Sequence, residues 1–315
     1  MKRNLINRLT IFSFALLIVS CIKVNDGPEK SGFNYNDYYT SKPDINNCVA
    51  GILNDKSKQT ALDELNYIRS LHNLQPVTYN SAYDNLVQQS ALISAANDAL
   101  SHTPTASYEC YTTDGATGSS ESNLALFESS IVATYTDQQM IDGWLTEDGS
   151  TAIGHRRWVL DPFLKYVSYG RVDGKPKKGS DAFVSAGSLK VINDDEADIT
   201  DLAVNYIAYP YGNYPTRLFP KNLFLSFSAL YDKTSTWANS SVTYQSAVVQ
   251  VALESSGQQL AVSSVSYDNE GYGIPNSIQW KVNGLKDNTS YVVSINNVSV
   301  NGVATNYQYK FTLVK

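Results

Sequence analysis

Two histidines and one glutamate have the side chains needed for chemistry at a shared site. His102 lies in "SHTP", His155 lies in "AIGHRRWVL", and Glu147 lies in "WLTED", three residues after Trp144. Two imidazoles and one carboxylate suit Zn²⁺ and leave a fourth position for water. A zinc-bound water is acidified and can attack a carbonyl or phosphoryl group. A divalent cation, zinc above all, is therefore one cofactor that these residues predict.

A groove without a dedicated metal is the alternative interpretation of these three residues. They lie on separate elements and lack the compact H-E-x-x-H arrangement of a specific zinc site. Two histidines that hydrogen-bond carboxylates would also organise a binding groove. The sequence offers no G-x-S-x-G nucleophile and no glycine loop for phosphate. The scattered positions of these three residues and the absence of a nucleophile motif together favour a binding protein over an enzyme.

Other residues near the site have structural explanations. Adjacent side chains point in different directions on a helix or a strand. We therefore expect one of Arg156 and Arg157 to pair with an internal acid and the other to meet solvent. We expect His72 at the surface or beside the C-terminal dipole of a helix. Trp144 and Trp158 are expected in the core.

Helices and a few strands must position these side chains. Leucine and isoleucine at three-residue spacing predict a first helix that begins near residue 58 and ends before Pro76. Similar patterns predict helices over 81–101 and 137–147. We expect a loop over 101–120 and strands over 166–172 and 182–191.

Five motifs in a fixed order identify a family resemblance. "LNYIRSLHNLQPVTYN", "SHTP", "SNLA", "WLTED" and "GHRRWVLDP" resemble the CAP superfamily of cysteine-rich secretory, antigen 5 and pathogenesis-related proteins, and its bacterial branch in particular. The resemblance covers about residues 58–190. It implies an α-β-α sandwich with an open cleft. In many members this cleft holds two histidines and two acidic residues, and some members bind a divalent ion there.

The resemblance implies a role for individual residues of this chain. His102, His155 and Glu147 match three of the four cleft positions, as metal ligands where a metal is bound. The fourth is open, because the family often has Glu directly before Asn-Leu, where this chain has Ser122. Glu121 lies one residue earlier, and a one-residue shift in an extended segment turns a side chain to the other face. Either Glu121 is a ligand or Ser122 faces the cleft.

The second half of the chain predicts an all-β sandwich. An acidic stretch over 195–204 indicates a boundary, and the Pro- and Tyr-rich residues 206–219 indicate a connector. Apolar residues then alternate over 277–282, 291–295 and 307–313, with Asn-Gly turns between them. Leu285, Thr289 and Tyr291 resemble the tyrosine corner of fibronectin type III domains. The predicted fold class is α+β, a CAP sandwich followed by an antiparallel immunoglobulin-like or fibronectin III-like sandwich.

The N-terminus resembles that of a bacterial lipoprotein. Basic residues precede the apolar run "LTIFSFALLIVS", which is too short to span a membrane comfortably. The run ends in "IVSC", which resembles a lipobox, so that Cys21 would be diacylated and would anchor the chain stably. The alternative is a cleaved soluble signal. The expected divisions are a signal peptide over 1–20, lipidated cysteine and tether over 21–47, CAP domain over 48–195 and sandwich over 196–315.

Two further cysteines and the charge balance complete the expectations. A secreted context favours a Cys48–Cys110 disulfide, worth about 4 kcal/mol on the chain-entropy model, over two free thiols. A net charge of −6 without a long basic run lacks the footprint of nucleic-acid binding. Residue 22 is Ile rather than Asp, so nothing signals retention at an inner membrane.

These features together predict an extracytoplasmic protein of the bacterial envelope. We expect it to be lipid-anchored at the outer membrane or cell surface, and to bind an unknown protein, glycan or lipid in its cleft, with no nucleic-acid partner. One alternative is a metal-dependent hydrolase of peptidase or nuclease type. Another is adhesion or glycan binding through the C-terminal sandwich.

Overall fold

A computed structural model describes residues 33–129 and 135–315 of the chain. The expected signal peptide and Cys21 lie outside these described residues. Within them, none of the helices combines the length and the apolar character that a membrane span requires.

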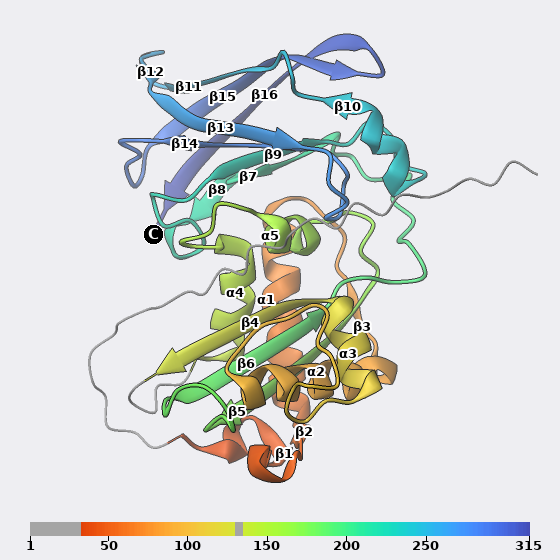
Figure 1. Ribbon diagram of the computed structural model, residues 1–315. Coiled ribbons are helices and arrows are strands. Elements are labelled where there is room, and N and C mark those ends of the chain that lie inside the picture. The colour runs from red at the N-terminus through yellow and green to blue at the C-terminus, as the bar shows by residue number, and fades with distance from the viewer. Residues whose placement is uncertain (1–32, 130–134) are drawn as a thin grey trace, which may run out of the picture.

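The first part of the described chain is a four-stranded sheet between two layers of helices (Figure 1). Its strand order is β3-β5-β6-β4, with β3 parallel to β5 and the other pairs antiparallel. Leu92 of α2 packs with Val172 on one face, whereas Leu65 of α1 and Trp144 of α4 pack on the other. This is the predicted α-β-α arrangement, and the α+β class is confirmed. The elements are α1 (Asp55–Leu71), β3 (Thr78–Tyr79), α2 (Asp84–Asn97), α3 (Thr113–Ser120), β4 (Ser122–Ser129), α4 (Asp137–Thr146), α5 (Gly154–Val159), β5 (Tyr166–Gly174) and β6 (Phe183–Lys190), with the 3-10 turn η3 (Ser81–Tyr83).

Helix α3 lies where the sequence predicted a loop, so that prediction is wrong. Thr112 caps the helix, since its hydroxyl accepts a hydrogen bond from the Gly115 N–H at 3.0 Å. Glycines lower the propensity of this segment for a helix. They also let it approach α2, because a Cβ on Gly118 would lie 2.1 Å from the Leu86 carbonyl oxygen. The glycines that suggested a loop are required by close packing between two helices.

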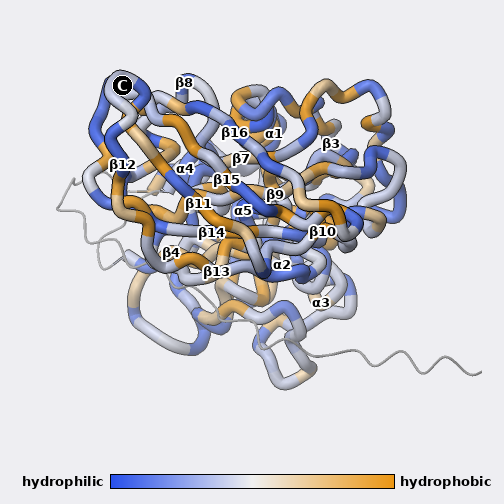
Figure 2. The backbone as a smooth tube through the Cα atoms, turned by 90° about the horizontal axis from the view of Figure 1, so that it is seen from above, coloured by the Kyte–Doolittle hydropathy of each residue, from blue (hydrophilic) through white to orange (hydrophobic). Residues whose placement is uncertain are grey.

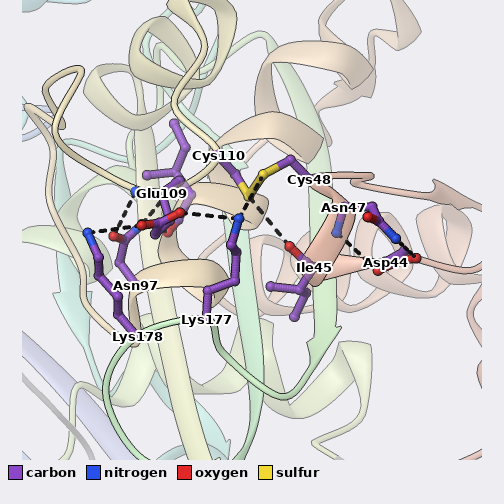
Figure 3. The surroundings of a disulfide bond; sticks show 10 residues. Asp44, Ile45, Asn47, Cys48, Asn97, Glu109, Cys110, Lys177 and Lys178 are labelled. Carbon is purple, nitrogen blue, oxygen red and sulfur yellow. Dashed lines mark hydrogen bonds and ion pairs between the residues drawn. A yellow bond between two sulfur atoms is a disulfide. The ribbon is translucent and has the colours of Figure 1, made fainter.

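The N-terminal segment packs on the first sheet rather than standing away from it as a tether. Tyr39 is buried, and its hydroxyl donates to the carboxylate of Asp173 in β5. The predicted Cys48–Cys110 disulfide is confirmed, with a Cα–Cα distance of 5.1 Å (Figure 3). It ties this segment to the loop that follows α2. The segment contains η1 (Tyr35–Asp37), β1 (Tyr39–Ser41), η2 (Ile45–Asn47) and β2 (Ile52–Leu53).

Two further sheets form the C-terminal part, above the first in Figure 1. One has the order β12-β11-β15-β16-β8, with β10 paired to β15, and the other has the order β13-β14-β9-β7. They face each other through aromatic rings, since Phe227 lies 5.0 Å and Tyr206 lies 6.1 Å from Tyr307 between ring centroids. Polar and apolar residues alternate along β15, as Figure 2 shows. The elements are β7 (Tyr206–Tyr209), β8 (Gly212–Pro215), η4 (Thr216–Leu218), β9 (Leu225–Ala229), η5 (Thr236–Ser241), β10 (Val242–Thr243), β11 (Val248–Leu253), β12 (Gln259–Leu260), β13 (Val262–Asp268), β14 (Ser277–Val282), β15 (Ser290–Val300) and β16 (Val303–Val314).

Two details of the C-terminal prediction need correction and one is confirmed. Residues 206–219 contain β7, β8 and η4 rather than a connector, and two of their tyrosines, Tyr209 and Tyr214, are fully buried. Strand β8 runs parallel to β16, so the sandwich is not wholly antiparallel. The tyrosine corner is present, since the hydroxyl of Tyr291 accepts a hydrogen bond from the Lys286 N–H at 2.7 Å.

The two parts share a continuous core and a polar contact surface. His72 is the C-cap residue of α1, one of the two positions expected for it, but it is buried rather than at the surface, and its Nε2 lies 3.0 Å from the Tyr214 hydroxyl. Burial lowers the pKa of His72 to about 3, so the ring is neutral at physiological pH. Arg217 of η4 reaches Glu64 and Asp142 at 2.7 Å each. These contacts fix the second part on α1 and α4.

Two glycine substitutions separate close packing from helix propensity. Gly118→Ala places a methyl group against the α2 backbone, so we expect a loss of about 3 kcal/mol in the free energy of unfolding. Gly143→Ala in α4 meets only Phe127, at 3.5 Å, and should be neutral or stabilising by up to about 1 kcal/mol. Urea denaturation of both variants measures the difference, and equal stability of the two would contradict the packing of α3 on α2.

Candidate functional site

One cavity of about 380 Å³ brings the predicted site residues together. His102, Ser122, Glu147 and His155 all line it, although they come from a loop, a strand, the end of α4 and the start of α5. Its other polar lining residues are Ser120, Asn123 and Ser150. Its remaining wall is made of apolar or small residues, namely Ala152, Gly154, Trp158, Val191, Ile192, Gly271 and Tyr272.

His102 is held by the end of α3. Its Nδ1 lies 2.9 Å from the carbonyl oxygen of Ser119. A carbonyl only accepts, so Nδ1 carries the proton and Nε2 of the neutral ring is an acceptor. Burial lowers the pKa of His102, and the nearby charge of His155 lowers it further. The ring is therefore neutral at physiological pH and presents one hydrogen-bond acceptor.

Glu147 is the cap of a short helix as well as a lining residue. It ends α4 in the left-handed conformation, with φ of 46°. Its two carboxylate oxygens accept the backbone N–H groups of His155 at 3.2 Å and Arg156 at 3.0 Å, which are the first unpaired donors of α5. Nδ1 of His155 lies 3.3 Å from the same carboxylate. Glu147 thus fixes both the start of α5 and the orientation of the His155 ring.

Ser122, rather than Glu121, faces the cavity. Ser122 is buried, and its hydroxyl has no hydrogen-bond partner among the described residues. Glu121 does not line the cavity, because its carboxylate pairs with Nζ of Lys190 at 2.5 Å. The structure therefore places the doubtful acidic residue on the far side of the chain. A buried hydroxyl without a partner is costly, and it marks a place where a ligand atom can bind.

Both arginines of "GHRRW" hold the C-terminal part, so the prediction that one meets solvent is wrong. The Arg156 guanidinium donates to the carbonyls of Leu145 and Thr146 and, across the boundary, to the Phe224 carbonyl at 2.8 Å. Its neighbour Arg157 pairs with Asp268 at 2.6 Å. A six-residue helix exposes different sides at successive positions, and here both sides are covered by protein.

The C-terminal part supplies one wall of the cavity. Arg157 also donates to the carbonyls of Glu270 at 2.6 Å and Ile274 at 3.0 Å, which fixes the loop between β13 and β14. This loop carries Gly271 and Tyr272 into the lining. The ring of Tyr272 lies over Gly154, since a Cβ on that glycine would be 3.6 Å from the ring. Sequence reasoning missed Tyr272, because no local pattern connects this loop to a cleft more than a hundred residues earlier.

The positions of the candidate ligand side chains test the predicted metal site. In the parts of the chain that the structure describes, no group of three His, Cys, Asp or Glu side chains is placed to hold a metal ion. Each oxygen of Glu147 accepts one backbone N–H group and keeps a further lone pair, so the carboxylate holds the α5 cap without losing all its acceptor capacity. In their present positions His102, Glu147 and His155 line one cavity but are not grouped closely enough to form one ligand set.

The titration of His102 tests the geometry of the site. We expect NMR to give His102 a pKa below the usual value near 6.5, and His155→Gln to raise it part of the way back, since burial remains. As the pH falls, His102 is therefore protonated at a higher pH in the unfolded chain than in the folded protein. The stability that His102 contributes is therefore present above pH 6.5 and is lost as the pH falls toward its folded pKa. An unchanged pKa in His155→Gln would show that the two rings do not interact.

Comparison with known proteins identifies the first part of the chain. A family model of the cysteine-rich secretory protein family, CAP, matches residues 62–186. No curated protein matches the chain. The matched range holds α2, the central sheet and the three predicted residues His102, Glu147 and His155. Residues 62–186 therefore form a CAP domain of the cysteine-rich secretory protein family.

Proposed function

We propose that this protein binds a ligand, without catalysis, in the cavity between its CAP domain and its C-terminal sandwich. One observation carries the proposal, the buried and unpartnered hydroxyl of Ser122 in a cavity of about 380 Å³ with mostly apolar walls. Small-molecule sites combine apolar walls with a few placed polar groups, and their volumes begin at roughly 300 Å³. The polar groups here include Ser122, His102 and His155.

The state of Glu147 favours binding over metal-dependent hydrolysis. A hydrolase of the predicted type needs this carboxylate as a metal ligand or a base. Each of its oxygens accepts one backbone N–H group in the first turn of α5, so this carboxylate already has a structural task, and removing it would leave those donors unpaired. The stabilisation of the helix and the positioning of His155 are the tasks that its contacts support.

A cavity-filling variant tests this function. Ala152 is an exposed lining residue, so Ala152→Trp should fill the cavity without disturbing the core. We expect members of a small-molecule fragment library to shift the NMR signals of His102 and His155 in the wild type and to leave them unchanged in the variant. Zn²⁺ should bind weakly, and its binding should drop in a His102→Ala, His155→Ala double variant.

Two results would contradict the binding function. One is a set of fragments that bind Ala152→Trp as well as the wild type. The other is zinc-dependent turnover of a peptide or nucleic acid that disappears in His102→Ala, since this would make the protein a hydrolase.

The lipid anchor belongs to the same proposal. It rests on the order of a basic start, a short apolar run and "IVSC" at the N-terminus. Growth of bacteria that express the protein with a labelled fatty acid should label the wild type and not Cys21→Ser, and only the wild type should partition with membranes. Equal release of both proteins into the medium would favour the soluble secreted form. In the proposed arrangement the protein acts outside the cytoplasm.

A further inference from the structure

Trp237 is an exposed aromatic residue that packs on Gly271, one of the residues that line the cavity. Its side chain is 64% exposed, although it belongs to the short turn η5 of the sandwich. A Cβ on Gly271 would lie 2.5 Å from the Trp237 ring, so the indole rests on the backbone of the loop that walls the cavity. The loop therefore has two aromatic side chains beside it or on it. Tyr272, which belongs to the loop, lines the cavity, whereas Trp237 packs on the loop and is not part of the lining.

The loop between β13 and β14, which carries Gly271 and Tyr272, is held in place by several hydrogen bonds. Arg157 holds it at Asp268, Glu270 and Ile274. The amide of Asn269 donates to the carbonyls of Val242 at 2.7 Å and Pro275 at 3.1 Å. Rigid aromatic side chains lose little conformational entropy on binding, which makes them effective contact residues.

The charge of the lining narrows the class of ligand. Of the described residues that line the cavity, none is lysine or arginine, and the one carboxylate, Glu147, is engaged by backbone donors. The uncharged polar groups of the lining are the side chains of Ser120, Ser122, Asn123 and Ser150 and the two imidazoles, and among them the Ser122 hydroxyl has no partner within the described residues. These groups match neutral hydroxyl or amide partners and offer no counter-charge to a phosphate or sulfate.

The position of Trp237 further restricts the class of ligand. The cavity lies near the lower end of the range for small-molecule sites, so it holds only a short part of a longer ligand. The remainder would pass over the outside of the loop, where the Trp237 ring is open to solvent. A lipid chain would gain most from enclosure, whereas a neutral sugar has apolar ring faces that pack on an exposed indole and hydroxyl groups that remain in water.

We propose that the ligand is a neutral oligosaccharide, with its terminal unit in the cavity and the next unit on Trp237. This rests on the proposed function, because it assumes that the cavity is the binding site. Trp237 and Tyr272 are then specificity-determining residues that the sandwich adds to the CAP domain.

The test compares neutral oligosaccharides of increasing length by calorimetry. Cello-, malto- and chito-oligosaccharides are titrated into the wild type, Trp237→Ala, Trp237→Phe and Tyr67→Ala. Tyr67 is the matched control, since it is 41% exposed on α1 and does not line the cavity. We expect one of the series to bind more tightly with length, Trp237→Ala to weaken the longer members about tenfold, and Trp237→Phe to restore most of the loss. Tyr67→Ala should bind as the wild type does.

The possible failures are distinguishable. Failure of every series to bind, while other fragments still bind the wild type and not Ala152→Trp, overturns the carbohydrate assignment and leaves the cavity function standing. Oligosaccharides that bind Trp237→Ala as tightly as the wild type overturn the role of Trp237. Sugar binding that persists in Ala152→Trp places the sugar site elsewhere and overturns the carbohydrate assignment, whereas the cavity function is overturned only if the fragments also still bind this variant.

Discussion

The hydrogen bonds of Arg156 are the interaction on which the rest of the structure depends. This guanidinium is buried, and it reaches the carbonyls at the end of α4 on one side and Phe224 of the sandwich on the other. It also lies 4.0 Å from the ring centroid of Tyr209. A buried charge is tolerated only where its donors are satisfied. The CAP domain and the sandwich must therefore stay in their present relation for the charge to remain buried.

Helix α5 carries both the arginines that hold the sandwich and a residue that lines the cavity. His155 faces the cavity, whereas Arg156 and Arg157, the next two residues, bind the sandwich. Glu147 holds the start of the same helix through two backbone N–H groups. A shift of the sandwich would thus move α5, and with it the ring of His155 and the wall that carries Tyr272. The second domain thus supplies part of the cavity wall.

The sequence allowed the CAP fold and much of the cavity to be predicted through a family resemblance, whereas local patterns alone predicted single helices and strands. The spacing of leucines gave α1, and an ordered set of short motifs pointed to His102, Glu147 and His155, which the structure places around one cavity. Long-range contacts could not be predicted in this way. Neither the capping role of Glu147 nor the partners of Arg156 leave a periodic signal. Helix α3 was missed for a related reason, since glycine favours loops and also permits close packing of helices.

The Cys48–Cys110 disulfide has a mechanical consequence. The chain enters the described structure at the end of the CAP domain that lies opposite the sandwich (Figure 1). A pull on the N-terminus would reach β1 and β2 first, and these form only a two-stranded sheet. The covalent bond at Cys48 then transfers the load to Cys110 and the segment that begins at His102. Forced unfolding depends on the unfolding rate. A pulling force would therefore first detach the residues that precede Cys48, and the bond would then arrest the unfolding with the cavity and the sandwich intact.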